Sequence, residues 1–176
     1  PGLDYDDAFS PVVRFDTVRI VLAIAAQKSL LVHQMDMISA FLHGTLSEEV
    51  YVEQPPGYEV QPAGEKVCHL QKSLYGLRQS PRCWNAALGG HLKGLELRQS
   101  DHDPCLFVNK AGQVFIVIYV DDLLLVAPDE KTVSQIKKQI SARFDSKDLG
   151  IAKSFLGVQI HVSAGKIWIH QEKYAR

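Results

Sequence analysis

The sequence predicts an α+β fold: a split βαββαβ pattern that forms an antiparallel sheet with helices on one face. Three observations predict it. Residues 113–127 are apolar apart from one short polar turn, as expected for two central strands joined in a hairpin. Segments 80–94 and 130–144 carry helix signals and flank that hairpin. Apolar segments 30–37 and 154–162 supply the first and last strands.

A helix is predicted before the first central strand. Residues 15–30, FDTVRIVLAIAAQKSL, carry apolar side chains at helical spacing, with Asp16 or Thr17 as the cap. Strand 30–37 follows, and its side chains alternate between two faces. Three of them share one face: Val32, Gln34 and Asp36.

Next comes a hairpin with a long loop. Its two β-leaning segments, 49–54 and 66–71, are separated by PPGYEVQPAGE, which is rich in turn residues. Helix 80–94 then begins with Ser80 as the N-cap and Pro81 at the first helical position.

The second half of the chain alternates strands and one strong helix. Strand 104–109 leads into the central hairpin through a tight turn at 110–112. Helix 130–144 has one apolar side, and segments 154–162 and 166–171 predict a final hairpin. The basic residues of that helix are interpreted as a solvated surface: Lys137, Lys138 and Arg143.

The composition is that of an ordinary globular domain, 46% hydrophobic and 22% charged. The net charge of −1 neither indicates nor excludes binding to nucleic acid. No apolar stretch reaches the roughly 18 residues of a membrane span, and the acidic start does not resemble a signal peptide. Three widely spaced cysteines indicate neither a zinc site nor a disulfide framework, and favour a reducing intracellular compartment: Cys68, Cys83 and Cys105.

Two adjacent aspartates interrupt the most apolar stretch of the chain. Asp121 and Asp122, in FIVIYVDDLLLVAP, avoid burial only if they lie at the tip of the hairpin. Two carboxylates fixed side by side repel each other and raise at least one pKa, unless a bound divalent metal reverses the effect. The pair Asp6–Asp7 is interpreted as ordinary turn chemistry, because its flanking residues are polar or turn-forming.

A third carboxylate would suit a metal site for phosphoryl transfer. Mg²⁺ prefers oxygen ligands and keeps waters and phosphate oxygens in its shell. Asp36 is the candidate, since it lies near the end of an apolar strand in HQMDMISAF. If strand 30–37 pairs beside the 113–127 hairpin, the three carboxylates converge at one edge of the sheet. Alone, Asp36 is better interpreted as a strand-end or cap residue, and only the combination favours the metal site.

Four segments, in order, carry a family resemblance: QMDMISAFLHG, KSLYGLRQSPRCW, YVDDLLL and SFLGVQI. Together they closely resemble the reverse transcriptase domain of copia-type LTR-retrotransposon Pol polyproteins. The resemblance covers nearly the whole chain and implies a right-hand polymerase fold. It assigns residues 1–29 and 45–79 to partial fingers, 30–44 and 80–153 to the palm, and 154–176 to the primer-grip hairpin and the start of the thumb.

The resemblance implies roles for the carboxylates. Asp36 resembles the first metal-binding aspartate of the family, and Asp121 and Asp122 resemble its YxDD pair. Together they would hold two Mg²⁺ ions, or Mn²⁺, one lowering the pKa of the primer 3′-OH and the other neutralising the triphosphate. The carbonyl group of Met37 is expected to assist.

Further residues resemble the nucleotide and primer contacts of the family. Phe41 stands where an aromatic steric gate favours dNTPs over rNTPs, with core packing as the alternative. Gln79 would contact the incoming nucleotide, and Arg78 or Arg82 a phosphate. Arg14 would approach the triphosphate from the fingers. The primer grip would comprise three residues: Phe155, Leu156 and Gly157.

The expected partners are an RNA or DNA template with its primer, dNTPs, and the remaining Pol polyprotein, including RNase H and integrase. The chain is expected to be one part of that polyprotein, without the rest of the thumb, in cytoplasmic virus-like particles and without membrane contact. Two other functions stay open: a non-catalytic remnant that binds nucleic acid weakly, and a metal-dependent nuclease or phosphatase. The last leaves LYGLRQ and FLGVQI unexplained.

Overall fold

The structure is a computed structural model that describes residues 10–60, 66–163 and 165–176, so the pair Asp6–Asp7 lies outside the described residues. The chain divides into two compact units. Among the described residues, one comprises Ser10 and Phe41–Ala87, and the other comprises Pro11–Ala40 and Leu88–Arg176. No helix in the described part of the chain has the length and apolar content needed to cross a membrane.

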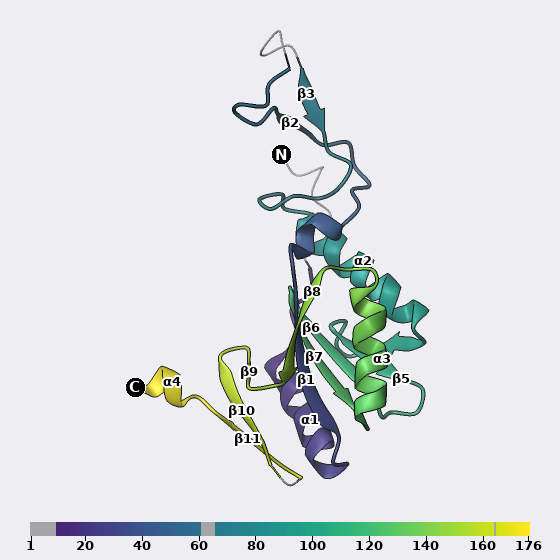
Figure 1. Ribbon diagram of the computed structural model, residues 1–176, viewed down its shortest axis with the longest axis vertical. Helices are drawn as coiled ribbons and strands as arrows, with labels where there is room; N and C mark the ends of the chain where they lie inside the picture. The colour runs from purple at the N-terminus through teal and green to yellow at the C-terminus, as the bar shows by residue number, and fades with distance from the viewer. Residues whose placement is uncertain (1–9, 61–65, 164) are drawn as a thin grey trace. The chain divides into compact units, whose positions relative to one another are not determined.

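The described residues form four α-helices and one short 3₁₀ helix (Figure 1). The helices are α1 (Phe15–Gln27), α2 (Ser80–Gly94), α3 (Glu130–Ser141), α4 (Glu172–Ala175) and the 3₁₀ helix η1 (Ala40–His43).

The strands form three sheets. The largest has the order β4-β5-β6-β7-β1-β8, a second has the order β11-β10-β9, and the third pairs β2 with β3. The strands of the first sheet are β4 (Leu97–Gln99), β5 (Leu106–Asn109), β6 (Phe115–Tyr119), β7 (Asp122–Ala127), β1 (Leu31–Met37) and β8 (Ser146–Ile151). The others are β9 (Ser154–Phe155), β10 (Val158–Ser163), β11 (Lys166–His170), β2 (Tyr51–Glu53) and β3 (Val67–His69).

The six-stranded sheet is antiparallel throughout, as predicted, and β6–β7 is its central hairpin. The predicted last strand was wrong. Residues 154–162 lie in the three-stranded sheet, and β8 takes the place beside β1. The sequence of β8, SKDLGI, lacks the apolar alternation that identifies a strand, in keeping with the absence of buried residues in it.

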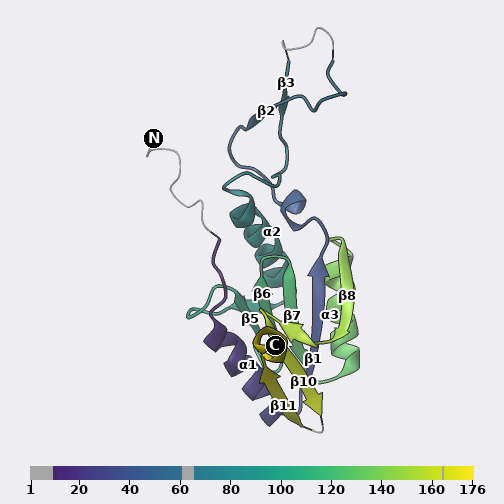
Figure 2. The same ribbon diagram turned by 90° about the vertical axis from the view of Figure 1, so that its left-hand side faces the viewer.

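Helices cover both faces of the large sheet. The second half of α2 and α3 pack on one face, as predicted: Gly89 of α2 approaches Phe107 of β5, and Lys137 of α3 bonds to His33 of β1. The prediction that helices lie on one face only was wrong, because helix α1 lies on the opposite side of β1 from α3 and packs its apolar side there (Figures 1 and 2). Its buried side chains share a core with one face of the central strands: Val18, Val21, Leu22, Ala25, Val32, Val117, Leu124 and Val126.

The start of α1 is capped from a distant loop. We predicted Asp16 or Thr17 as the cap, but Arg14 occupies the N-cap position and makes no side-chain cap bond. The buried carboxylate of Asp103 accepts bonds from the Arg14 amide (3.1 Å) and the Thr17 hydroxyl (2.6 Å). Its other oxygen accepts from the Cys105 amide (2.9 Å). Asp103 therefore satisfies helix-end donors that the local sequence leaves open.

Helix α3 begins at its N-cap Asp129, whose carboxylate accepts from the Thr132 amide at 2.8 Å. Its apolar side is buried as predicted, but the interpretation of Lys137 as solvated was wrong. Lys137 is only 8% exposed, whereas Lys138 is exposed. The long side chain of Lys137 lies along the apolar face and ends at polar partners on two strands.

Candidate active site

The tip of the β6–β7 hairpin carries the predicted aspartate pair. Tyr119 pairs with Asp122, so the loop consists of Val120 and Asp121 alone. Val120 has φ +54°, a conformation that is strained for a β-branched residue. The tight loop fixes Asp121 beside the first residue of β7, at the end of the apolar strands.

Strand β1 brings Asp36 to this tip. The predicted pairing of strand 30–37 beside the hairpin is confirmed, and Asp36 lies directly opposite Asp122 in the register. Such partners have Cβ atoms about 4.5–5.5 Å apart and project from the same face. The Met37 amide also donates to the Asp121 carbonyl group at 2.8 Å, which ties the loop to β1.

The environment of Asp122 disfavours its charge. Burial raises the pKa of Asp122, and the negative charges of Asp121 and Asp36 raise it further, while a hydrogen bond from Gln34 opposes the shift. Gln34 Nε2 donates to Asp122 Oδ1 at 3.1 Å. We did not assign Gln34 a role from the sequence, although its place on the face of Asp36 was a usable signal.

A cation extends the row of side chains. Lys147 of β8 pairs with Asp36, so four residues cross the sheet in line on one face: Tyr119, Asp122, Asp36 and Lys147. We did not predict Lys147, because no local pattern indicated strand β8. The carboxylate pair thus has a basic side chain on its outer flank.

The site suits a metal that substrate helps to coordinate. In residues 10–60, 66–163 and 165–176, no three His, Cys, Asp or Glu side chains are grouped to hold a metal ion on their own. Mg²⁺ is commonly bound through one or two carboxylates together with waters and substrate phosphates. The Asp36–Asp122 pair fits this kind of site, because a divalent cation would offset the repulsion that raises the pKa of Asp122.

The predicted primer grip forms a tight turn in the same unit. Phe155 is buried in the core shared with α1, and it pairs with Val158. The two loop residues, Leu156 and Gly157, have φ +51° and +77°, as in a type I′ hairpin. Arg14 belongs to this unit too, with an exposed side chain at the start of α1.

The remaining predicted contacts belong to the unit of residues 41–87. Phe41 is half-buried in η1, and the centroid of its ring lies 4.7 Å from the centroid of the Tyr75 ring. The Gln79 carbonyl group accepts the first α-helical bond of α2, from the Cys83 amide (2.9 Å). Gln79, and not the predicted Ser80, is therefore the N-cap.

Two arginines of this unit differ in their surroundings. Arg82 forms an ion pair with Glu48, while Arg78 has an exposed side chain. The hydroxyl of Ser80, free of the predicted capping role, donates to the Leu74 carbonyl group at 2.5 Å. The local fold thus explains Ser80 and Arg82 without a ligand.

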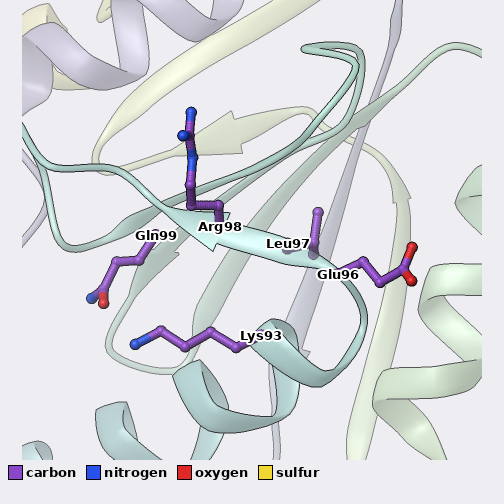
Figure 3. Close-up of a pocket in the computed structure, with 5 residues that line it drawn as sticks. All are labelled: Lys93, Glu96, Leu97, Arg98 and Gln99. Atoms are coloured by element: carbon purple, nitrogen blue, oxygen red, sulfur yellow. The ribbon is translucent and has the colours of Figure 1, made fainter.

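A shallow hollow of ≈ 520 Å³ lies between the end of α2 and β4 (Figure 3). Its cations diverge: the Arg98 side chain extends from β4 on the side away from Lys93. No predicted site residue lines it. The lining residues are Lys93, Glu96, Leu97, Arg98 and Gln99.

Comparison with known proteins identifies the family of the chain. A family model described as reverse transcriptase (RNA-dependent DNA polymerase) matches residues 1–176. The Pol polyprotein from transposon TNT 1-94 of Nicotiana tabacum is 41% identical over 98% of this chain and 13% of its own length. Those from transposons RE1 and RE2 of Arabidopsis thaliana are 38% and 36% identical over 99% of this chain and 12% of theirs.

The chain thus spans about one-eighth of the length of these relatives. No solved structure matches it. The family match over the whole chain, together with identities above one-third to retrotransposon Pol polyproteins, decides the assignment. The chain belongs to the reverse transcriptase family of retrotransposon Pol polyproteins.

Proposed function

We propose that the chain is the fingers–palm part of an RNA-directed DNA polymerase. It adds dNTPs to a primer 3′-OH, directed by an RNA or DNA template. The observation that carries the proposal is the position of Asp36 directly opposite Asp122, with Asp121 in the adjoining two-residue loop. Family membership supports nucleotidyl transfer as the reaction class.

The carboxylates have separate parts in this proposal. Asp36 and Asp122 bind divalent cations, Mg²⁺ or Mn²⁺, and Asp121 completes the site from the loop. Two bound cations would lower the pKa of the 3′-OH and neutralise the triphosphate. Gln34 orients the Asp122 carboxylate by donating a hydrogen bond to its Oδ1 atom (3.1 Å). This bond would hold the carboxylate in place for metal coordination.

The other residues position substrates. Phe41 excludes a 2′-OH, with the carbonyl group of Met37 near the metal. Phe155, Leu156 and Gly157 hold the primer end, and the two-residue turn next to the buried Phe155 supports this role. The nucleotide and its phosphates are contacted by Gln79, Arg78 and Arg14. The remaining partner is the rest of the Pol polyprotein, including RNase H and integrase.

Primer extension tests the proposal. A Pol protein that contains this segment should extend a DNA primer on an RNA template with Mg²⁺. Asp36→Asn, Asp121→Asn and Asp122→Asn should each lower the rate at least about 100-fold, as expected when an electrostatic group at the reacting centre is lost. Asp101→Asn, at an exposed aspartate outside the site, is the matched control.

Two results would contradict the proposal. Extension by Asp122→Asn at the parental rate would remove the carboxylates from the mechanism. A parent protein that folds and binds nucleic acid but never extends a primer would support the non-catalytic remnant instead. Calorimetric titration with Mg²⁺ separates metal binding from folding in either case.

A further inference from the structure

A buried polar network lies on the side of the sheet that α3 covers. The Lys137 ammonium group donates to His33 Nδ1 (2.9 Å) and to Asp148 Oδ1 (2.6 Å). These bonds join α3 to β1 and β8. Lys137 and His33 are 8% and 6% exposed, so both polar groups have left bulk water. A lysine buried in this way requires its partners, because an unpaired ammonium is costly in the interior.

The lysine fixes the protonation state of His33. An ammonium group only donates, so His33 Nδ1 accepts and the ring proton resides on Nε2. Nε2 faces Glu130 Oε1 at 3.5 Å and has no hydrogen-bond partner among the described residues. The charged groups around the ring are thus Lys137 and Glu130 from α3 and Asp148 from β8, while β7 presents the apolar Leu125.

Strand β8 has an irregular register on β1. Gln34 pairs with Gly150 and Met35 with Asp148, which leaves Leu149 as an extra residue in a β-bulge. Gly150 has φ +74°, and its amide donates to the same Asp148 oxygen at 2.8 Å. The Asp148 carboxylate therefore closes the bulge and receives Lys137 at one point.

Hydrophobic patterning does not hold this register. Every residue of β8 is exposed or half-exposed, and β8 is an edge strand. A one-residue slip would move Lys147 from the carboxylate face to the face that α3 covers. The side-chain bonds to β8 from α3 are polar: Lys137 to Asp148, and Ser141 Oγ to Ser146 Oγ at 2.8 Å.

We propose that Lys137 is a positioning residue: from the α3 side of the sheet it fixes β8 on β1 through Asp148, and so keeps Lys147 opposite Asp36. Protonation of His33 would bring a second cation next to the ammonium group, so acid weakens this hold. The structural claim stands by itself, and its effect on catalysis rests on the proposed function.

Hydrogen exchange of the chain, followed by mass spectrometry, tests the structural claim. Lys137→Met should make amides of 146–151 exchange about tenfold faster, while those of 115–127 stay protected. Lys138→Met, at the exposed neighbour in α3, should change neither segment. Asp148→Asn provides a milder second variant, because the Asp148 side chain is 56% exposed. In this variant the buried Lys137 ammonium group keeps its hydrogen bond to His33.

The pH dependence distinguishes positioning from general stabilisation. Burial, and then the charge of Lys137, lower the pKa of His33 from its ordinary value. In the parent, exchange in 146–151, corrected for the intrinsic rate, should therefore rise only as the pH falls below about 6.5, the ordinary pKa of histidine. His33→Gln keeps an acceptor without a titrating ring, so this step should disappear. Unchanged protection of 146–151 in both Lys137→Met and Asp148→Asn would overturn the proposal, as would equal loosening of 115–127.

Primer extension by the Pol protein then tests the catalytic consequence. Lys137→Met should lower the rate about tenfold at neutral pH, and Lys138→Met should not. If 146–151 loosens while the parent protein shows no extension, the proposed function fails and the positioning role stands. If extension is normal in the parent and in Lys137→Met although 146–151 loosens, the link to the carboxylate site fails.

Discussion

Replacing Asp122 by asparagine should stabilise the chain and remove its activity. Asparagine has nearly the same volume and keeps the oxygen that accepts the bond from Gln34. It removes a half-buried negative charge that lies opposite Asp36 and next to Asp121. The proposed metal binding requires this charge, so on that proposal stability and function oppose each other at this position.

The distance between the paired strands sets the size of the effect. Two unit charges about 5 Å apart repel by about 0.8 kcal/mol in water and about 3 kcal/mol at an effective dielectric constant of 20. Asp122 is half-buried, so we expect a gain of about 1–2 kcal/mol. The raised pKa of Asp122 means that this cost exists above the folded pKa and disappears on acidification. The gain should therefore be largest at neutral pH.

Urea denaturation of the chain at neutral and acidic pH, with and without Mg²⁺, measures the effect. Mg²⁺ at ten times its dissociation constant should stabilise the parent by about 1.4 kcal/mol and Asp122→Asn by much less. Asp101→Asn should behave like the parent in every condition. Destabilisation by Asp122→Asn at neutral pH, or an equal response of both proteins to Mg²⁺, would refute the electrostatic reasoning.

Three further predictions concern the backbone and the cysteines. Val120→Asn should stabilise the chain by about 1 kcal/mol in urea denaturation, because asparagine tolerates the positive φ at this position. A loss of stability would show that the loop is unstrained. Gly44→Ala should cost about 1–3 kcal/mol, since an added Cβ would stand 2.6 and 2.7 Å from its nearest neighbours. Gly90 lies in α2, where an added Cβ would meet nothing within 4 Å, so Gly90→Ala should instead stabilise the chain by about 0.5–1 kcal/mol. Equal changes in thermal stability for Gly44→Ala and Gly90→Ala would contradict both predictions. Burial, and then the charge of Asp103, raises the pKa of the Cys105 thiol to about 12. Iodoacetamide at mildly alkaline pH should therefore label the half-exposed Cys68 first. Early labelling of Cys105 in peptide mass spectra would contradict its burial.

Local sequence patterns predicted much of the carboxylate site. The apolar runs on both sides of Asp121–Asp122 required a hairpin with the aspartates at its tip, and the structure has that hairpin as β6–β7. The run around Asp36 predicted a strand, and the metal site required that strand to pair beside the hairpin, which it does with β7. These features are encoded by neighbouring residues, so periodicity and turn chemistry identify them.

Contacts between distant segments decided the rest. Nothing in SKDLGI indicates a strand, because β8 buries no side chain and is held by pairing with β1 and by polar bonds from α3. The local sequence around Lys137 is that of a surface lysine. Only its hydrogen bonds to His33 and Asp148 offset the cost of burying its ammonium group. Likewise, Asp103 caps a helix that begins 88 residues earlier, at Phe15.

By itself, the sequence determined the hairpin, its two aspartates and the strand that carries Asp36, since alternation and turn formation depend on adjacent residues. The tertiary structure alone decided that Lys147 flanks Asp36 and that Gln34 holds Asp122. The physical reason is that strand register and buried polar pairs arise from segments far apart in the chain, whose partners exist only after folding.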